Sequence, residues 1–304
     1  MKTYLCILGV AFLCAATGTV QAEVNIFACE PEWAALAEEI GGGKVKTFAA
    51  THARQDPHHI RARPSLIAKA RRADLILCSG AGLEQGWLPI LLRKAAADVQ
   101  PGTKGYLAAA EIVPILEKPA VVDRSLGDVH PEGNPHVHLH PKNILLVARE
   151  LTKRLESIDA GNAAFYRGRL KDFTSRWNQA MENWKKKASS LKGKTVVVHH
   201  RAFSYFLNWL DIKAVASLEP KPGIPPTTSH LEGLLRQLKA KSADLIIRTP
   251  YEPDKASEWL SGKTSIPAVV LPYTIDGVAE SGSLFALFDR SISLFKGAIP
   301  SAAK

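Results

Sequence analysis

The chain has 304 residues, with 39 lysines and arginines against 29 acidic residues and a formal net charge of +10. A chain of this length can form two α/β cores. A net charge this positive raises the question of whether the protein binds nucleic acid. The positive residues are scattered, however, and the only run of three, at 185–187, is typical of a solvated helix face. We therefore expect no nucleic-acid partner.

The first 22 residues have the pattern of a secretory signal peptide. Lys2 is followed by a mostly apolar run over 4–16 and by Val20-Gln21-Ala22, which ends in a small residue. The run is too short to span a bilayer comfortably, and Leu13 stands where a small residue would precede a lipoprotein cysteine at Cys14. We expect residues 1–22 to be removed, leaving a soluble periplasmic protein that is not a lipoprotein.

Short apolar strands alternate with amphipathic helices after this segment, which indicates a parallel α/β sheet. Two cysteines remain after processing, Cys29 and Cys78, each near a predicted strand end. An export compartment permits a disulfide between them, and two buried thiols are the alternative. No Cys-x-x-Cys occurs, which excludes a structural zinc site of thiolates. The predicted strands are 24–28, 45–49 and 74–77, and the predicted helices are 31–40, 64–72 and 83–97.

A single long helix is predicted next, over 159–190. Its apolar residues, among them Tyr166, Phe173, Trp177 and Trp184, recur every three or four positions along one face. At 1.5 Å per residue this helix would be roughly 45 Å long, and we interpret it as a rod that braces two lobes.

The alternation of strands and helices then resumes. The residues from Ser229 to Glu232 have the pattern of a capping box that opens a helix. We expect an α/β fold of two Rossmann-like parallel-sheet lobes, 23–158 and 191–304, each with its own core and joined by the bracing helix at 159–190. The predicted strands of the second half are 195–199, 243–247 and 268–271, and two further helices are predicted at 254–261 and 283–296.

Nine of the ten histidines fall in three clusters, and only His230 lies alone. Imidazole is the commonest borderline-soft metal ligand in proteins, although any single histidine is more often a core or solvated residue. Ligands of open parallel sheets bind beyond the carboxyl ends of strands. His58 follows the second strand, His136 lies in the insertion that closes the first lobe, and His200 follows the strand at 195–199. Two lobes that close on one ion would therefore bring these three together.

At these residues the chain closely resembles the cluster A-I receptors of bacterial ABC transporters, which bind zinc or manganese. The motifs are Asp56-Pro57-His58, Asn134-Pro135-His136 and His200-Arg201-Ala202-Phe203, and the resemblance covers essentially the whole mature chain. It implies that His58, His136 and His200 are metal ligands and that the receptor delivers the ion to a membrane permease. It leaves open whether a periplasmic metallochaperone loads the site, and we expect a monomer.

The fourth metal ligand is less well determined than the first three. The family often uses an aspartate near the last strand, and in this chain Asp276 is the residue that fits. Glu252, His130 and a water molecule are the alternatives. Three imidazoles with at most one carboxylate favour Zn²⁺ over Mn²⁺, in near-tetrahedral geometry.

The other histidines of the 130–140 cluster, His130, His138 and His140, are expected outside the immediate site. The segment 123–134 is rich in Gly, Pro, Asp and His and lacks periodicity. We expect it to be mobile and to help capture metal; a plain exposed polar loop is the alternative.

Two other classes of protein use similar features. A zinc-dependent hydrolase would also use three histidines, but it needs a general base and a substrate pocket. The chain has no His-Glu-x-x-His, no Gly-x-Ser-x-Gly and no nucleotide-binding glycine loop, so we do not expect an enzyme. A receptor for haem or a corrinoid could also brace two lobes with a helix, and colour in the purified protein would reveal it.

Overall fold

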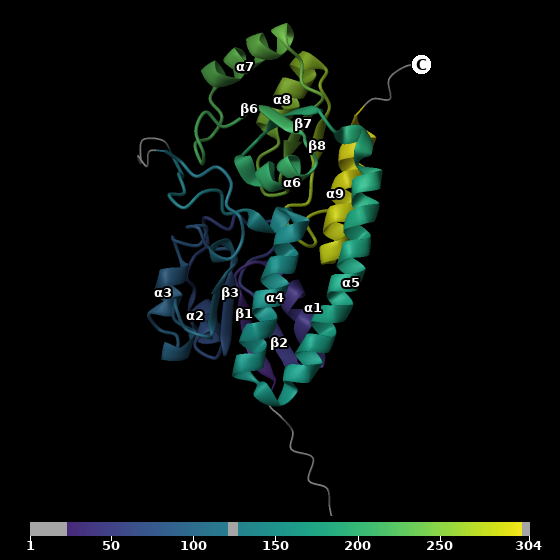
Figure 1. The fold of residues 1–304 in the computed structure, drawn as a ribbon. Coiled ribbons are helices and arrows are strands. Elements are labelled where there is room, and N and C mark those ends of the chain that lie inside the picture. Colours follow the sequence, from purple (N-terminus) through teal and green to yellow (C-terminus); the bar gives the residue numbers. More distant parts are fainter. Residues whose placement is uncertain (1–22, 121–126, 300–304) are drawn as a thin grey trace, which may run out of the picture.

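The computed structural model describes residues 23–120 and 127–299 in two lobes with a long helix beside them (Figure 1). The predicted signal peptide, the cysteine at position 14 and residues 121–126 of the histidine-rich segment lie outside the described residues. Within the described ranges, no helix combines the length and apolar character needed to cross a membrane.

Each lobe contains a four-stranded parallel sheet, and the two sheets have the same order. The first is β2-β1-β3-β4 and the second is β6-β5-β7-β8. The central strands are buried along their length, as in β3, where all four residues are buried; this explains their continuous apolar sequence. The first sheet comprises β1 (Val24–Ala28), β2 (Val45–Ala49), β3 (Leu75–Cys78) and β4 (Tyr106–Ala108), and the second β5 (Thr195–Val198), β6 (Lys213–Ser217), β7 (Leu245–Arg248) and β8 (Ala268–Val270).

Helices cover both faces of each sheet. In the N-terminal lobe, α1, α2 and α3 all carry proline in the first turn, where the missing N–H has no cost. In the C-terminal lobe, Thr227 caps α7 by accepting a hydrogen bond from His230 N, so the cap lies two residues before the predicted cap at Ser229. The helices are α1 (Pro31–Gly41), α2 (Pro64–Ala70), α3 (Leu88–Leu92), α6 (Ser204–Trp209), α7 (Thr228–Ala240), α8 (Lys255–Thr264) and α9 (Leu284–Ala298).

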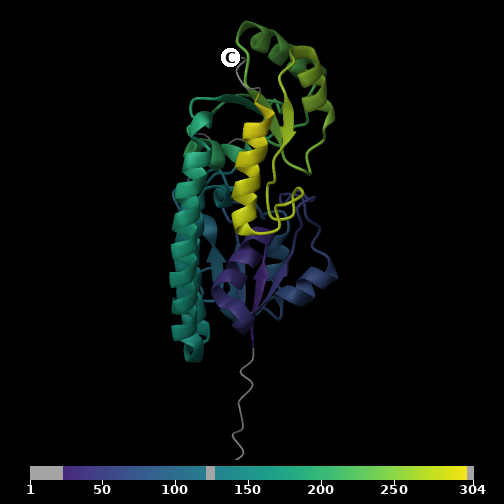
Figure 2. The same cartoon turned by 90° about the vertical axis from the view of Figure 1, so that its right-hand side faces the viewer.

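One long helix joins the lobes, and a second helix of the N-terminal lobe precedes it and packs against it. The helix α4 (Pro141–Ile158), absent from the predicted elements, is followed by a 3-10 turn (Ala160–Asn162) and then by α5 (Ala163–Lys187). The observed helix α5 is therefore shorter at both ends than the helix predicted at 159–190. Its 25 residues span about 37 Å. Figure 2 shows α5 running beside both lobes and next to α9. Its aromatic stripe is buried as predicted.

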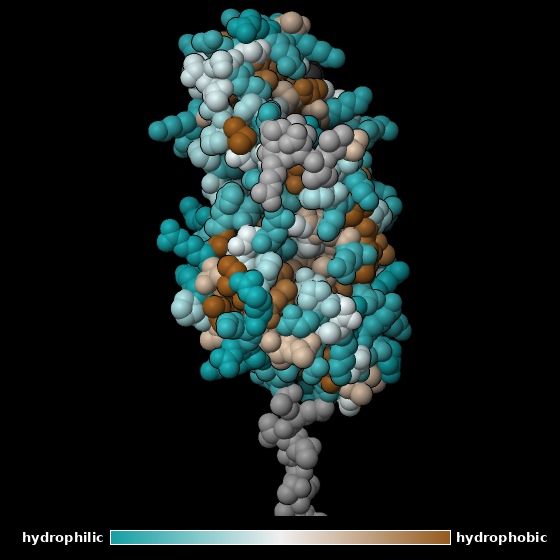
Figure 3. Space-filling view, turned by 90° about the vertical axis from the view of Figure 1, so that its left-hand side faces the viewer, coloured by the Kyte–Doolittle hydropathy of each residue, from teal (hydrophilic) through white to brown (hydrophobic). Residues whose placement is uncertain are grey.

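The prediction that each lobe has a separate core is only half right. The outer sheet faces do have their own cores, one beneath α2 and α3 and one beneath α7 and α8. The inner faces share one continuous core that runs from Trp33 through Trp177 on α5 to Phe288 on α9. The lobes are thus held together by common apolar packing. On the face shown in Figure 3, apolar side chains are scattered among hydrophilic ones.

A disulfide joins the adjacent carboxyl ends of β1 and β3. Cys29 and Cys78 are both fully buried, and their Cα atoms lie 4.8 Å apart. Of the two alternatives for these cysteines, the structure contains the bonded one.

Candidate metal centre

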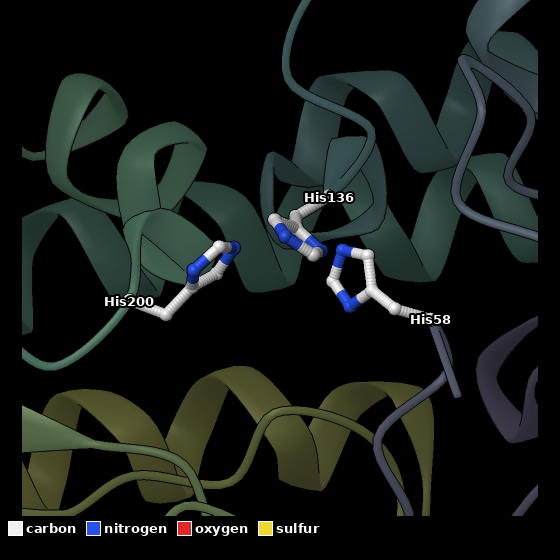
Figure 4. Close-up of side chains that lie close together, drawn as sticks. All are labelled: His58, His136 and His200. Carbon is white, nitrogen blue, oxygen red and sulfur yellow. The ribbon is translucent and has the colours of Figure 1, made fainter. Parts of the chain in front are cut away.

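The three histidines of the predicted motifs meet between the lobes, as Figure 4 shows. His58 lies in the loop after β2, His136 precedes a 3-10 turn (Val137–Leu139), and His200 is the second residue after β5. One ring nitrogen of each lies within 4.8 Å of those of the other two. The predicted convergence of these three side chains is therefore present in the fold.

The Nδ1 atom of each of the three rings has a hydrogen-bond partner on the side away from the cluster. Nδ1 of His58 donates to Asp56 Oδ1 at 2.7 Å, and Nδ1 of His200 donates to Glu219 Oε2 at 2.7 Å. Nδ1 of His136 lies 2.8 Å from the hydroxyl of Tyr273. Occupied Nδ1 atoms leave Nε2 of each ring for the centre of the cluster, which is the usual arrangement of metal-binding histidines.

The two Asx-Pro-His motifs have a local physical basis. Asp56 Oδ1 accepts from the backbone N–H of His58 at 3.0 Å, and Asn134 Oδ1 accepts from that of His136, also at 3.0 Å. These are Asx turns, in which a short side chain caps the backbone two residues later. Each motif therefore fixes the backbone from which its imidazole projects.

Burial and charge act differently on the three imidazoles. Burial lowers the pKa of His136 well below its ordinary value, and positive charge on His58 and His200 lowers it further. Burial also opposes the charged form of His200, but the hydrogen bond and the negative charge of Glu219 outweigh it and raise the pKa of His200. His136 is thus held neutral and ready to bind metal, whereas His200 holds a proton more readily.

Asp276 is not brought to this cluster. Its side chain is exposed, its backbone adopts a positive φ of 61°, and its N–H donates to the carbonyl of Ser281. The loop after β8 turns so that Tyr273, three residues earlier, faces His136 instead. Among the described residues, the carboxylate predicted as fourth ligand therefore lies away from the histidines.

His130, one of the alternatives for the fourth position, lies beside the cluster. Its Nε2 is 3.3 Å from Nε2 of His58, and burial lowers its pKa to about 4. Its segment is held by Asp128, whose N–H donates to the carbonyl of Pro222 in the other lobe at 2.8 Å. No motif surrounds His130 in the sequence, and this contact between distant segments is what places it next to His58.

The same contact brings together two segments that lie over the site, one around Asp128 and one around Gly223. We call them the covering segments. Gly223 follows Pro222 with a φ of +73°, and a Cβ there would lie 2.1 Å from Asp128 Oδ2. Its N–H donates to Glu219 Oε2 at 3.0 Å, the same oxygen that accepts from His200. The glycine thus permits the close approach that places His130 over the site.

Glu252, another candidate for the fourth position, lies beside the site. It lines a cavity of about 160 Å³ together with His58, His200 and Glu219. Its Oε2 accepts from the backbone N–H of Thr249 at 2.6 Å, and burial raises its pKa to about 7. This carboxyl group is therefore partly engaged with its own loop.

The remaining histidines of the 130–140 cluster have structural contacts. His138 is completely buried, with Nδ1 3.1 Å from Glu32 Oε1, and its Nε2 donates to the carbonyl of Tyr273 at 2.8 Å. His140 caps α4 by accepting from Lys142 N at 3.1 Å. Both lie outside the group formed by His58, His136 and His200, as predicted.

A model of the ZnuA family, described as zinc-uptake complex component A, periplasmic, matches residues 26–292. The metal ABC transporter substrate-binding lipoprotein ScbA of Streptococcus cristatus is 26% identical over 272 residues, covering 88% of this chain and 84% of ScbA. The manganese ABC transporter substrate-binding lipoprotein PsaA of Streptococcus anginosus is 27% identical over 255 residues, covering 81% of this chain and 78% of PsaA. Both are named lipoproteins, unlike our prediction for this chain.

Solved structures confirm the fold. A crystal structure of ZnuA aligns with a TM-score of 0.77 at 19% identity, covering 91% of this chain and all of that one. The Mn-bound periplasmic metal binding protein from Candidatus Liberibacter asiaticus aligns with a TM-score of 0.73 at 16% identity, covering 91% of this chain and 100% of that protein. The relatives named here are transport proteins, so they give the hydrolase alternative no support.

Proposed function

This chain belongs to the ZnuA family of metal ABC transporter substrate-binding proteins, and on that premise we propose that it captures Zn²⁺ between its lobes for a membrane permease. The metal is the transported cargo. The observation that supports this proposal is the convergence of three imidazoles whose Nδ1 atoms are all occupied. We propose that Nε2 of His58, His136 and His200 bind the ion.

The choice of zinc over manganese rests on the donor atoms. Two carboxylates near the site, Asp56 and Glu219, are engaged as acceptors for imidazole N–H groups. The imidazole nitrogens therefore face the cluster, with Glu252 as one further carboxyl group beside it. Nitrogen donors suit zinc, whereas manganese prefers carboxylate oxygens. The two negative charges also match the charge of one divalent ion.

We propose His130 as the fourth ligand, with Glu252 or a water molecule as the alternative. Its Nε2 is already near that of His58, and zinc–nitrogen bonds of about 2.0–2.1 Å would require only small movements of the rings. Four imidazoles would complete a tetrahedral nitrogen site. Manganese has little preference for such a set.

The experiment is elemental analysis of protein purified without chelator or affinity-tag metal, followed by competition titration with Zn²⁺ and Mn²⁺. We expect one zinc per chain. Four ligands sharing about 10–16 kcal/mol give roughly 2.5–4 kcal/mol each, so replacing any one with alanine should weaken zinc binding about 10²–10³-fold. The ligand variants are His58→Ala, His136→Ala, His200→Ala and His130→Ala.

The lone histidine provides the matched control. His230 donates from Nε2 to the carbonyl of Ser217 in the C-terminal lobe, and His230→Ala should retain full affinity. Full zinc affinity in His200→Ala would refute the three-histidine site. Full affinity in His130→Ala, with loss in the other three, would leave Glu252 or water as the fourth ligand.

We also propose that the mature protein is a soluble periplasmic monomer that begins at Glu23. Mass spectrometry of the mature N-terminus tests this against a chain lipidated at Cys14, and light scattering coupled to gel filtration tests the oligomeric state. A lipid-modified cysteine would show that this chain is anchored, as the names of its relatives would suggest.

A further inference from the structure

One residue of the C-terminal lobe contacts two histidines of the N-terminal lobe. Tyr273 lies three residues after β8 and is almost completely buried. Its hydroxyl is 2.8 Å from Nδ1 of His136, and its carbonyl accepts from Nε2 of His138 at 2.8 Å. The ring also lies edge-on to both imidazoles, with centroids 5.4 and 4.8 Å away.

The hydroxyl of Tyr273 differs in kind from the groups behind the other two site histidines. Asp56 and Glu219 are carboxylates, which accept hydrogen bonds when ionised. A tyrosine hydroxyl can either accept or donate. If it donates to Nδ1 of a neutral His136, the ring proton must be on Nε2, and that nitrogen has no lone pair for a metal. If it accepts from Nδ1–H, the lone pair of Nε2 faces the cluster.

The position of the hydroxyl is fixed by a buried network across the lobe interface. Glu32, on α1 of the N-terminal lobe, lies 3.1 Å from Nδ1 of His138 and accepts from the hydroxyl of Thr274. His138 in turn donates to the carbonyl of Tyr273. Glu32 and His138 are fully buried, and Thr274 is nearly so. The backbone on both sides of the tyrosine carbonyl is therefore tied to the opposite lobe.

We propose that Tyr273 is a positioning residue by which the C-terminal lobe selects the metal-binding tautomer of His136. In the zinc-bound protein its hydroxyl oxygen accepts from Nδ1–H of His136, which directs the lone pair of Nε2 to the ion. This inference rests on the proposed function, because it assumes that His136 binds the metal. It makes a residue of one lobe necessary for full metal affinity of a ligand on the other.

The test is Tyr273→Phe, which removes only the hydroxyl and keeps the buried ring. Loss of such a supporting contact typically weakens metal binding about 10–100-fold, and we expect that loss in competition titration with Zn²⁺. The matched control is Tyr166→Phe. Tyr166 is a buried tyrosine on α5 whose hydroxyl donates to Asp159 Oδ2. We expect it to change affinity by less than about threefold.

A second measurement separates positioning from packing. In the zinc-bound protein, nitrogen-15 NMR of labelled histidines should show a slowly exchanging Nδ1–H on His136. That proton should exchange rapidly in Tyr273→Phe, while those of His58 and His200 are unchanged. Unaltered affinity together with an unaltered His136 signal in Tyr273→Phe would overturn the inference, and the proposed function would stand if His136→Ala still lost zinc. Full zinc affinity in His136→Ala would instead overturn both.

Discussion

Replacing Glu219 with glutamine should weaken zinc binding and alter its dependence on pH. Glu219 Oε2 accepts from Nδ1 of His200 at 2.7 Å and from the N–H of Gly223 at 3.0 Å. The amide oxygen of glutamine can still accept, so the substitution removes the negative charge and leaves the shape. Loss of a supporting group of this kind costs about 10–100-fold in metal affinity, or about 1.4–2.7 kcal/mol.

The pH dependence follows from the direction of the pKa shifts. Burial opposes charge on His200, but Glu219 raises its pKa above the ordinary value of about 6.5. The pKa of His136 is lowered, so His200 takes up a proton before His136 does as the pH falls. That proton competes with zinc, and wild-type affinity should therefore start to fall as the pH drops through the raised pKa of His200.

In Glu219→Gln the imidazolium of His200 loses its counter-ion, and its pKa falls. The difference in zinc affinity between wild type and variant should then be largest above the raised pKa of His200, where this imidazole is neutral in both proteins, and should shrink as the pH falls below it. We compare about pH 8 with about pH 6. Competition titration with a fluorescent chelator at both pH values measures it. Glu232→Gln, an exposed substitution on α7, is the matched control. The reasoning would be refuted if wild type and Glu219→Gln had equal zinc affinities at both pH values, or if the ratio of their affinities did not change with pH.

Three further outcomes are expected. Asp276→Asn should leave zinc affinity unchanged in competition titration, because this side chain is exposed and away from the cluster. Replacing Cys29 and Cys78 with serine opens a link between residues 49 positions apart; by loop entropy this should lower the free energy of unfolding in urea by about 4 kcal/mol. Gly223→Ala should cost about 1–3 kcal/mol of folding stability through its positive φ. It should also weaken zinc binding, because the added methyl crowds the segment that carries His130.

Controls separate these effects from general damage. Gly262→Ala places a methyl group in open space on α8; it should leave zinc affinity unchanged and, because alanine is the better helix former, should not lower stability. A tenfold loss of affinity in Asp276→Asn would restore that residue as a ligand. An unchanged free energy of unfolding in the double serine variant would show that the disulfide does not restrain the unfolded chain. Unchanged zinc affinity in Gly223→Ala would separate the covering segments from the site.

The sequence determined the parts of this protein that depend on neighbours along the chain. Buried strands appear as continuous apolar runs, and the stripe from Tyr166 to Trp184 predicts α5 because every side chain on that face must be covered. The Asx turns at His58 and His136 join residues only two positions apart. Such features follow from local hydrogen bonding and periodicity. The residues of α4 carry the same periodicity, so this helix too is a local feature of the sequence.

Tertiary structure alone decided which side chains complete the site. Asp276 and Tyr273 belong to one loop, and the path of that loop turns the phenol towards His136 and the carboxylate towards solvent. His130 reaches His58, 72 positions away, because its segment rests on Pro222 of the other lobe. The inner faces of the two sheets likewise share one core through α5. These contacts join residues far apart in the chain, and their geometry is set by how whole elements pack, which no local pattern records.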